Sequence, residues 1–163
     1  MTFAIRSALP SDAEGCRAIY APFVTATWVS FEEEVPSARE MKRRIEGYGY
    51  SHGWVVAEAD GRIAGYAYGS PYRLREAYRF SCDVAIYVDP ECTGQGIGRG
   101  LYDALFPVLV AKDVHSAHAG IALPNDSSVA FHKAAGFREV GTYREVGWKF
   151  DAWRDVSWWQ KLL

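Results

Sequence analysis

Short runs of β-branched and aromatic residues recur along the chain, and residues that favour turns separate them. Such runs are typical of strands that bury one face. They predict strands near residues 3–8, 54–58, 62–68, 78–88, 115–122, 140–150 and 156–162. Asp60-Gly61 should join the second and third strands as a hairpin, because these two residues tolerate the positive φ angles of a type I′ turn.

Apolar residues three or four positions apart predict four helices between these strands. Residues 11–14 and 37–40 each begin with serine and end with glutamate, the spacing of a capping box that starts a helix. The first helix should end near Pro22, which has no N–H to donate. The third helix contains Pro107 and should kink there or have its end shifted, and the fourth covers residues 126–135.

Strands and helices therefore mix without strict alternation. This order predicts one α/β domain over residues 1–163, with three layers around a mixed sheet. A chain of this length can bury about two-thirds of its unfolded surface. No repeat, linker or low-complexity segment divides it.

Composition and charge narrow the classes of function. The formal net charge of −2 creates no general attraction for polyanions, so nucleic acid is not an expected partner. Cys16, Cys82 and Cys92 lack metal-ligand spacing and are odd in number. Without a signal peptide or a long apolar run, we expect a reduced cytoplasmic protein that uses neither a metal nor a membrane. Aromatic residues crowd the C-terminus, which indicates core packing or a subunit interface.

A glycine-rich stretch in the middle of the chain carries the strongest functional signal. Asp89-Pro90 ends a strand, Gly94, Gly96 and Gly98 follow at alternate positions, and an amphipathic helix begins directly after them. Glycines let bare amides approach a phosphate, and the unpaired N–H groups of a helix N-terminus point the same way. Arg99 adds a cation, so the stretch predicts an anion site, although a simple tight turn would show the same pattern.

Two familiar nucleotide-binding motifs do not fit this stretch. A dinucleotide loop should follow the first strand and precede an acidic residue by about 20 positions. Here the loop lies in mid-chain, and the residue at that distance is His118. A P-loop needs Gly-Lys-Ser/Thr, which is absent.

The segment Thr93-Gly-Gln-Gly-Ile-Gly98 resembles the pyrophosphate loop of the GNAT superfamily of N-acetyltransferases, which bind acetyl-CoA. The superfamily pattern is Gln/Arg-x-x-Gly-x-Gly/Ala. Gly96 and Gly98 match it, whereas Thr93 stands where glutamine or arginine is usual. The next motif of the superfamily is matched about thirty residues later by Asn125, Ser128, His132, Gly136 and Phe137.

Three further segments resemble the phosphinothricin and methionine sulfoximine acetyltransferases within that superfamily. They are Leu123-Pro-Asn-Asp126, Arg144-Glu-Val-Gly147 and Asp155-Val-Ser-Trp-Trp-Gln160. The resemblance covers nearly the whole chain. It implies a three-layer α/β/α fold around a largely antiparallel sheet, acetyl-CoA as co-substrate, a small-molecule amine as acceptor, and a homodimer.

The resemblance also implies a set of residues that hold acetyl-CoA. Three lie at the end of the strand before the loop, seven lie in the loop and the helix start, and two lie at the next helix. They are Ile86, Tyr87, Val88, Thr93, Gly94, Gln95, Gly96, Ile97, Gly98, Arg99, Asn125 and Ser128.

Asp83 is the first candidate for the general base that removes a proton from the acceptor amine. It lies four residues before Tyr87, on the predicted central strand, among apolar side chains. In the phosphinothricin-type enzymes a glutamate at this position is the presumed base, so the aspartate is shorter by one methylene. The alternative is that Asp83 only ends the strand or pairs with Arg79.

His132 is the second catalytic candidate. Its spacing from Asn125 and Ser128 places all three on one helical stripe. The resemblance puts this stripe beside the pantetheine arm, where many relatives have a tyrosine that protonates the thiolate. Imidazole can hold or accept a proton near neutral pH. The alternative is a histidine that serves only the core or the surface.

Two segments are candidates for contact with the acceptor. Arg73 and Arg75 would point to the same side of an extended loop, and arginine binds carboxylate or phosphinate oxygens with two parallel hydrogen bonds. Residues 25–35 combine aromatic rings with carboxylates, and the resemblance places Phe31 and Glu33 of this segment at the acceptor pocket. A solvated surface is the alternative for both segments.

Together these features predict an acetyl-CoA-dependent N-acetyltransferase that acts on the α-amine of small amino-acid analogues. Phosphinothricin, methionine sulfoximine and methionine sulfone are the implied acceptors. Two alternatives stay open: an acetyltransferase for another small amine or a protein N-terminus, and a sensor that binds acetyl-CoA without turnover.

Overall fold

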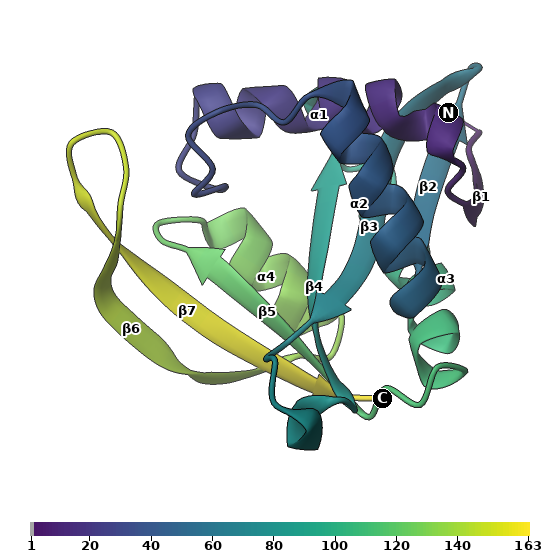
Figure 1. Cartoon of the computed structure of the whole chain (residues 1–163). Helices are drawn as coiled ribbons and strands as arrows, with labels where there is room; N and C mark the ends of the chain where they lie inside the picture. Colours follow the sequence, from purple (N-terminus) through teal and green to yellow (C-terminus); the bar gives the residue numbers. More distant parts are fainter. Residues whose placement is uncertain (1) are drawn as a thin grey trace.

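A computed structural model describes residues 2–163 and contains a seven-stranded sheet with helices on both faces (Figure 1). The strands lie in the order β1-β2-β3-β4-β5-β7-β6. Their bounds are β1 Ala4–Ser7, β2 Trp54–Ala59, β3 Arg62–Pro71, β4 Ser81–Val88, β5 Ser116–Ala122, β6 Arg138–Trp148 and β7 Trp153–Leu162. The helices are α1 Ala13–Thr25, α2 Ala38–Ser51, α3 Ile97–Val110 and α4 Asp126–Ala134.

Every pair of neighbouring strands is antiparallel except β4 and β5. The parallel pair is short, with Ser81, Cys82 and Asp83 of β4 opposite residues 116–118 of β5. Beyond this point the two strands diverge (Figure 1). The predicted mixed, largely antiparallel sheet is therefore confirmed, and its single parallel pair opens a gap near the middle of the sheet.

Alternating residues of the sheet fill two separate cores, which explains the three layers. Val55 and Ala57 of β2 pack in the core that α3 covers, whereas Trp54 and Val56 pack in the core under α1 and α2. Successive side chains of a strand point to opposite faces, so one strand serves both cores. The three-layer α/β/α arrangement follows from this alternation.

The glycine-containing turns have the backbone conformations that the sequence predicts. Asp60 and Gly61 have φ angles of 51° and 75° in the β2–β3 hairpin. Gly94 and Gly96 have φ angles of 75° and 82°, and Gly96 is the N-cap of α3. A side chain with a Cβ atom is strained at such angles, so glycine at these two positions shapes the start of α3.

The start of α1 differs from the prediction. A 3₁₀ turn, Pro10–Asp12, precedes the helix, and no capping box forms at Ser11. Asp12 takes over this end instead, because its Oδ2 accepts the Leu9 N–H at 2.7 Å and pairs with Arg6 at 2.7 Å. The predicted box at residues 37–40 forms in part, since Ser37 Oγ accepts the Glu40 N–H while the Glu40 carboxylate binds Arg43 and Arg44.

Both prolines inside helices are tolerated. α1 continues three residues beyond Pro22, whose carbonyl accepts the Ala26 N–H at 2.9 Å, so the prediction that the helix ends near Pro22 is wrong. α3 likewise reaches Val110 beyond Pro107. A proline removes its own N–H from the ladder and its ring crowds the carbonyl four residues earlier, but its own carbonyl still accepts from the next turn.

Candidate functional site

The gap between β4 and β5 holds two adjoining cavities. A large one of about 710 Å³ and a small one of about 70 Å³ share the β4 residues Val84, Ala85 and Tyr87 and the β5 residues Gly120 and Ala122. Side chains of β4 two residues apart point to the same face, which is why Asp83, Ala85 and Tyr87 line the large cavity together. Diverging strands thus create a site that reaches into the sheet.

The start of α3 is built almost entirely from backbone. Apart from its chain neighbours, no atom of the described residues 2–163 lies within 4 Å of a Cβ atom added at Gly94 or Gly96, so both glycines border open space. Gly98 differs, because a Cβ there would come within 3.1 Å of the Phe131 ring of α4. Open space beside exposed amides at a helix N-terminus suits a phosphate group.

The polar side chains of this loop mostly bind the loop itself. Thr93 Oγ1 donates to the Pro90 carbonyl at 3.0 Å, and Arg99 pairs with Asp103 at 3.2 Å on the exposed face of α3. Asp89 Oδ1 accepts the Glu91 N–H at 3.0 Å. These bonds fix the turn and leave the approach to the amides open.

The predicted stripe on α4 forms, and its three members line the small cavity together with Ile86. Asn125 is the N-cap of α4, and its Oδ1 accepts the Ser128 N–H at 3.2 Å. The Ser128 carbonyl in turn lies 2.8 Å from Nδ1 of His132. The structure therefore brings the β4 end and the α4 stripe to one cavity.

His132 is buried and both of its ring nitrogens have partners. A carbonyl can only accept, so Nδ1 carries the proton that Ser128 accepts, and Nε2 accepts from the Tyr102 hydroxyl at 2.9 Å. Burial lowers the pKa of His132 below its usual value. The imidazole is thus neutral near pH 7, and neither nitrogen is free for a further partner while these bonds hold.

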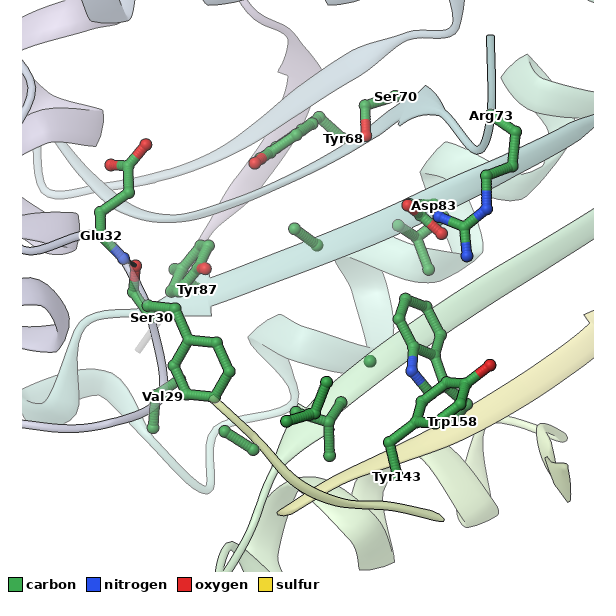
Figure 2. Close-up of a pocket in the computed structure, with 17 residues that line it drawn as sticks. Val29, Ser30, Glu32, Tyr68, Ser70, Arg73, Asp83, Tyr87, Tyr143 and Trp158 are labelled. Atoms are coloured by element: carbon green, nitrogen blue, oxygen red, sulfur yellow. Dashed lines mark hydrogen bonds between the residues drawn. The ribbon is translucent and has the colours of Figure 1, made fainter. Parts of the chain in front are cut away.

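The large cavity is enclosed by segments that lie far apart in the sequence (Figure 2). Its lining comes from the α1–α2 connection, from β3 and the turn after it, and from β4, β5, β6 and β7. The residues are Val29, Ser30, Phe31, Glu32, Tyr68, Ser70, Arg73, Asp83, Val84, Ala85, Tyr87, Gly120, Ala122, Tyr143, Val146, Val156 and Trp158.

Asp83 is the most unusual group in this cavity. Its Oδ1 is buried and has no hydrogen-bond partner among residues 2–163. Burial raises the pKa of Asp83 to about 7, although the nearby Arg73 charge opposes the rise. Figure 2 shows the Arg73 guanidinium facing this carboxyl, whereas Arg79 pairs with Glu76 instead. A carboxyl of this kind exchanges a proton near neutral pH.

Only part of the predicted acceptor set lines the large cavity. Phe31 and Arg73 are there, and the Arg73 guanidinium also stacks over the Tyr72 ring at 4.6 Å. Glu33 and Arg75 are exposed and lie outside the lining, while Glu32 occupies the place that we expected for Glu33. The bend after Pro71 breaks the extended conformation on which the pairing of Arg73 with Arg75 depended.

Sequence reasoning missed most of the remaining walls. Tyr68 and Ser70 of β3 share the spacing of two that puts side chains on one face, a signal that could have been used. Tyr143 and Trp158 face the cavity from β6 and β7, which lie far along the chain. No local pattern near Asp83 points to either of them.

The described part of the chain shows neither a metal cluster nor a membrane span. No group of three or more His, Cys, Asp and Glu side chains in residues 2–163 is placed to hold a metal ion. None of the helices in the same range has the length and apolar character needed to cross a bilayer.

Comparison with known proteins agrees with the geometry. The model of the acetyltransferase (GNAT) domain matches residues 5–158. A phosphinothricin N-acetyltransferase from Streptomyces coelicolor is 38% identical over 98% of this chain and 95% of its own length. An L-methionine sulfoximine/L-methionine sulfone acetyltransferase from Pseudomonas paraeruginosa is 30% identical over 100% of this chain and 96% of its own.

Solved structures lead to the same family. A GNAT superfamily phosphinothricin acetyltransferase from Sinorhizobium meliloti, crystallised with acetyl-CoA, has a TM-score of 0.93 at 35% identity and covers 100% of this chain and 89% of its own. A ribosomal-protein-alanine N-acetyltransferase from Brucella melitensis has a TM-score of 0.94 at 34% identity, covering 98% and 99%. The chain is therefore an N-acetyltransferase that belongs to the GNAT superfamily, among the phosphinothricin and methionine sulfoximine acetyltransferases.

Proposed function

We propose that this enzyme transfers the acetyl group of acetyl-CoA to the α-amine of a small amino-acid analogue such as phosphinothricin, methionine sulfoximine or methionine sulfone. The observation that carries the proposal is Asp83, a carboxyl with an unpartnered buried oxygen and a pKa of about 7 in a cavity of about 710 Å³. The named relatives support the choice of acceptors.

In this proposal acetyl-CoA lies along the small cavity and the start of α3. The amides from Gly94 to Arg99 would hold the pyrophosphate, because they lie at a helix N-terminus and Gly94 and Gly96 border open space. The end of β4, with Ile86, Tyr87 and Val88, and the α4 residues Asn125 and Ser128 would hold the pantetheine arm. Bound there, acetyl-CoA supplies the acetyl group as a thioester.

Asp83 would act as the general base. An α-ammonium group must lose a proton before it can attack, and α-amino groups in peptides titrate at a pKa of about 8. A carboxyl with a pKa of about 7 accepts that proton more readily than an ordinary aspartate does. Its unpartnered Oδ1 provides the acceptor atom.

His132 would contribute in a different way. Its neutral ring forms part of the small cavity, and the Nδ1–H that Ser128 now accepts is its one exchangeable proton. Protonation of the leaving thiolate by His132 would require this bond to open. We therefore propose that His132 mainly fixes α4 and the arm of the cofactor, and that Asp83 dominates the proton transfer.

Arg73 would bind a negative group of the acceptor, and the rings of Phe31 and Trp158 would cover its apolar part. A guanidinium matches the two oxygens of a carboxylate or phosphinate. The Arg73 guanidinium faces Asp83 (Figure 2), so the negative group and the amine of the acceptor would bind at neighbouring side chains. Glu33 and Arg75, which lie outside the cavity lining, would contribute little.

A thiol-release assay with acetyl-CoA tests the proposal. The acceptors are phosphinothricin, methionine sulfoximine and methionine sulfone at millimolar concentration, with a peptide bearing a free N-terminal alanine as the comparison. We expect turnover with at least one amino-acid analogue and an acetylated product by mass spectrometry. Turnover of the peptide alone would mean that the acceptor is a protein N-terminus. Acetyl-CoA binding without any turnover would indicate a sensor.

We also propose that the protein is a cytoplasmic homodimer. β6 is an edge strand, and Val140, Tyr143, Val146 and Trp148 on it are each more than half exposed. An edge strand with apolar side chains is suited to pairing with a second copy. Sedimentation equilibrium should give twice the mass of the chain, and Val140→Lys together with Val146→Lys should give the monomer.

A further inference from the structure

Lys149, which plays no part in the proposed chemistry, is buried at the turn between β6 and β7, with 4% of its surface exposed. Its Nζ donates to three backbone carbonyls, those of Val24 at 2.7 Å, Ser30 at 2.5 Å and Glu32 at 2.8 Å. An ammonium group has three protons, so all its donors are used. Burial lowers the pKa of Lys149, and the carboxylates of Glu32 and Glu33 oppose that effect.

The three carbonyls belong to one stretch of chain. Val24 is in the last turn of α1, where carbonyls have no partner within the helix. Ser30 and Glu32 lie in the segment of residues 29–32, which is neither helix nor strand and forms one wall of the large cavity. Lys149 thus donates hydrogen bonds to carbonyls that do not take part in helix or strand hydrogen bonding.

Two further contacts from β6 and β7 hold the same cavity wall. Gly147 of β6 lies so close to Phe31 that an added Cβ atom would collide with the ring. Arg154 of β7 stacks over the Trp28 ring at 4.4 Å. The β6–β7 hairpin, far away in sequence, therefore positions residues 28–32.

We propose that Lys149 is a positioning residue that sets the shape of the acceptor cavity by holding residues 29–32, which rests on the proposed acceptor role of that cavity. The ammonium is compact enough to meet three carbonyls at once, whereas the planar guanidinium of arginine is not. Loss of the ammonium would leave these three carbonyls, two of them in buried hydrogen bonds, without their donor and release the wall. The glycine loop that would hold acetyl-CoA lies outside this network.

Hydrogen exchange of the free enzyme tests directly whether Lys149 holds residues 29–32 in place. Lys149→Met keeps the length of the side chain and removes all three donors. We expect amides of residues 27–34 to exchange about tenfold faster or more, with the α3 amides unchanged. The matched control is Lys112→Met, which removes a lysine whose Nζ donates to a single carbonyl, that of Tyr50 in α2 at 2.6 Å. Unchanged exchange in residues 27–34 would overturn the proposal.

Steady-state kinetics test the consequence for the acceptor. We expect Lys149→Met to raise the acceptor KM about tenfold with the acetyl-CoA KM within about twofold, and Lys149→Arg to restore little of it. Gly147→Ala displaces Phe31 and keeps Lys149, so it should also raise the acceptor KM and leave the acetyl-CoA KM nearly unchanged. This variant replaces Lys149→Met in the test if Lys149→Met does not fold. Equal rises in both KM values would assign Lys149 a general structural role. If the wild type acetylates no amine, the proposed function is wrong. The exchange data would still show whether Lys149 holds residues 29–32.

Discussion

The start of α3 and the large cavity between β4 and β5 offer different groups to a ligand. The start of α3 offers backbone amides, shaped by two glycines with positive φ angles and bordered by open space. The large cavity offers side chains, which six segments of the chain contribute. A backbone site tolerates most substitutions except those at its glycines, whereas a side-chain site depends on each group separately. Four substitutions test this contrast.

Asp83→Asn should have the largest effect. We expect kcat to fall by roughly 10²- to 10⁴-fold, the range that general-base catalysis supplies. In the wild type the rate should rise as the pH passes through about 7, because Asp83 must be deprotonated to act. The variant should lose this inflection. Asp113→Asn, on an exposed turn, is the control, and a normal rate for Asp83→Asn would move the base to His132.

Gly96→Val should have the second-largest effect, and it should weaken the binding of acetyl-CoA without changing the binding of the acceptor. A β-branched residue at a φ angle of 82° is strained, and its side chain would fill the open space beside the amides. Strain of about 1–3 kcal/mol corresponds to a rise in the acetyl-CoA Kd of roughly 5- to 150-fold. Calorimetry measures it, with Gly47→Val on the exposed face of α2 as the control. Unchanged binding would place the cofactor elsewhere.

Arg73→Ala should have a moderate effect on the acceptor. We expect its KM to rise about tenfold through the loss of a charge-assisted pair, with little change for acetyl-CoA. The inflection of the pH profile should also move to higher pH, because the Arg73 charge lowers the pKa of Asp83. Arg75→Ala is the matched control and should change neither quantity. Equal effects of both substitutions would mean that the arginines only hold the loop.

Thr93→Ala should have the smallest effect. The Thr93 hydroxyl donates to the Pro90 carbonyl and so supports the turn. Loss of one exposed hydrogen bond should raise the acetyl-CoA Kd by less than about fivefold. A larger loss by calorimetry would show that a side chain, and not only backbone, binds the cofactor at this loop.

The contrast also explains what the sequence could predict. The glycine loop and the α4 stripe are local patterns, and each needs only a turn and a helix to form. The hairpin at Asp60-Gly61 belongs to the same class. One error in the fold occurred where a tertiary contact replaced a local rule, because Asp12 binds Arg6 and forms the start of α1 in place of the Ser11 capping box.

The acceptor cavity could be predicted only in part. Asp83 is a candidate from the sequence because a carboxylate among apolar residues is unusual, but only the folded chain shows that its Oδ1 is buried without a hydrogen-bond partner among residues 2–163. Tyr143, Trp158 and Lys149 reach the site from the C-terminal hairpin, and no spacing along the chain connects them with Phe31. Only the register of β5, β6 and β7 brings them together.

Asp83 has a consequence for the stability of the folded chain. Its pKa is higher in the folded protein than in an unfolded chain, so the native state binds the proton more tightly. The free energy of unfolding should therefore fall as the pH rises from the ordinary carboxyl range to about 7, by at most about 1.4 kcal/mol per pH unit. Asp83→Asn, which carries no charge, should melt at a higher temperature than the wild type above neutral pH and lose that advantage in mild acid. The residue that we propose to drive the reaction would thus weaken the fold under the conditions in which it works.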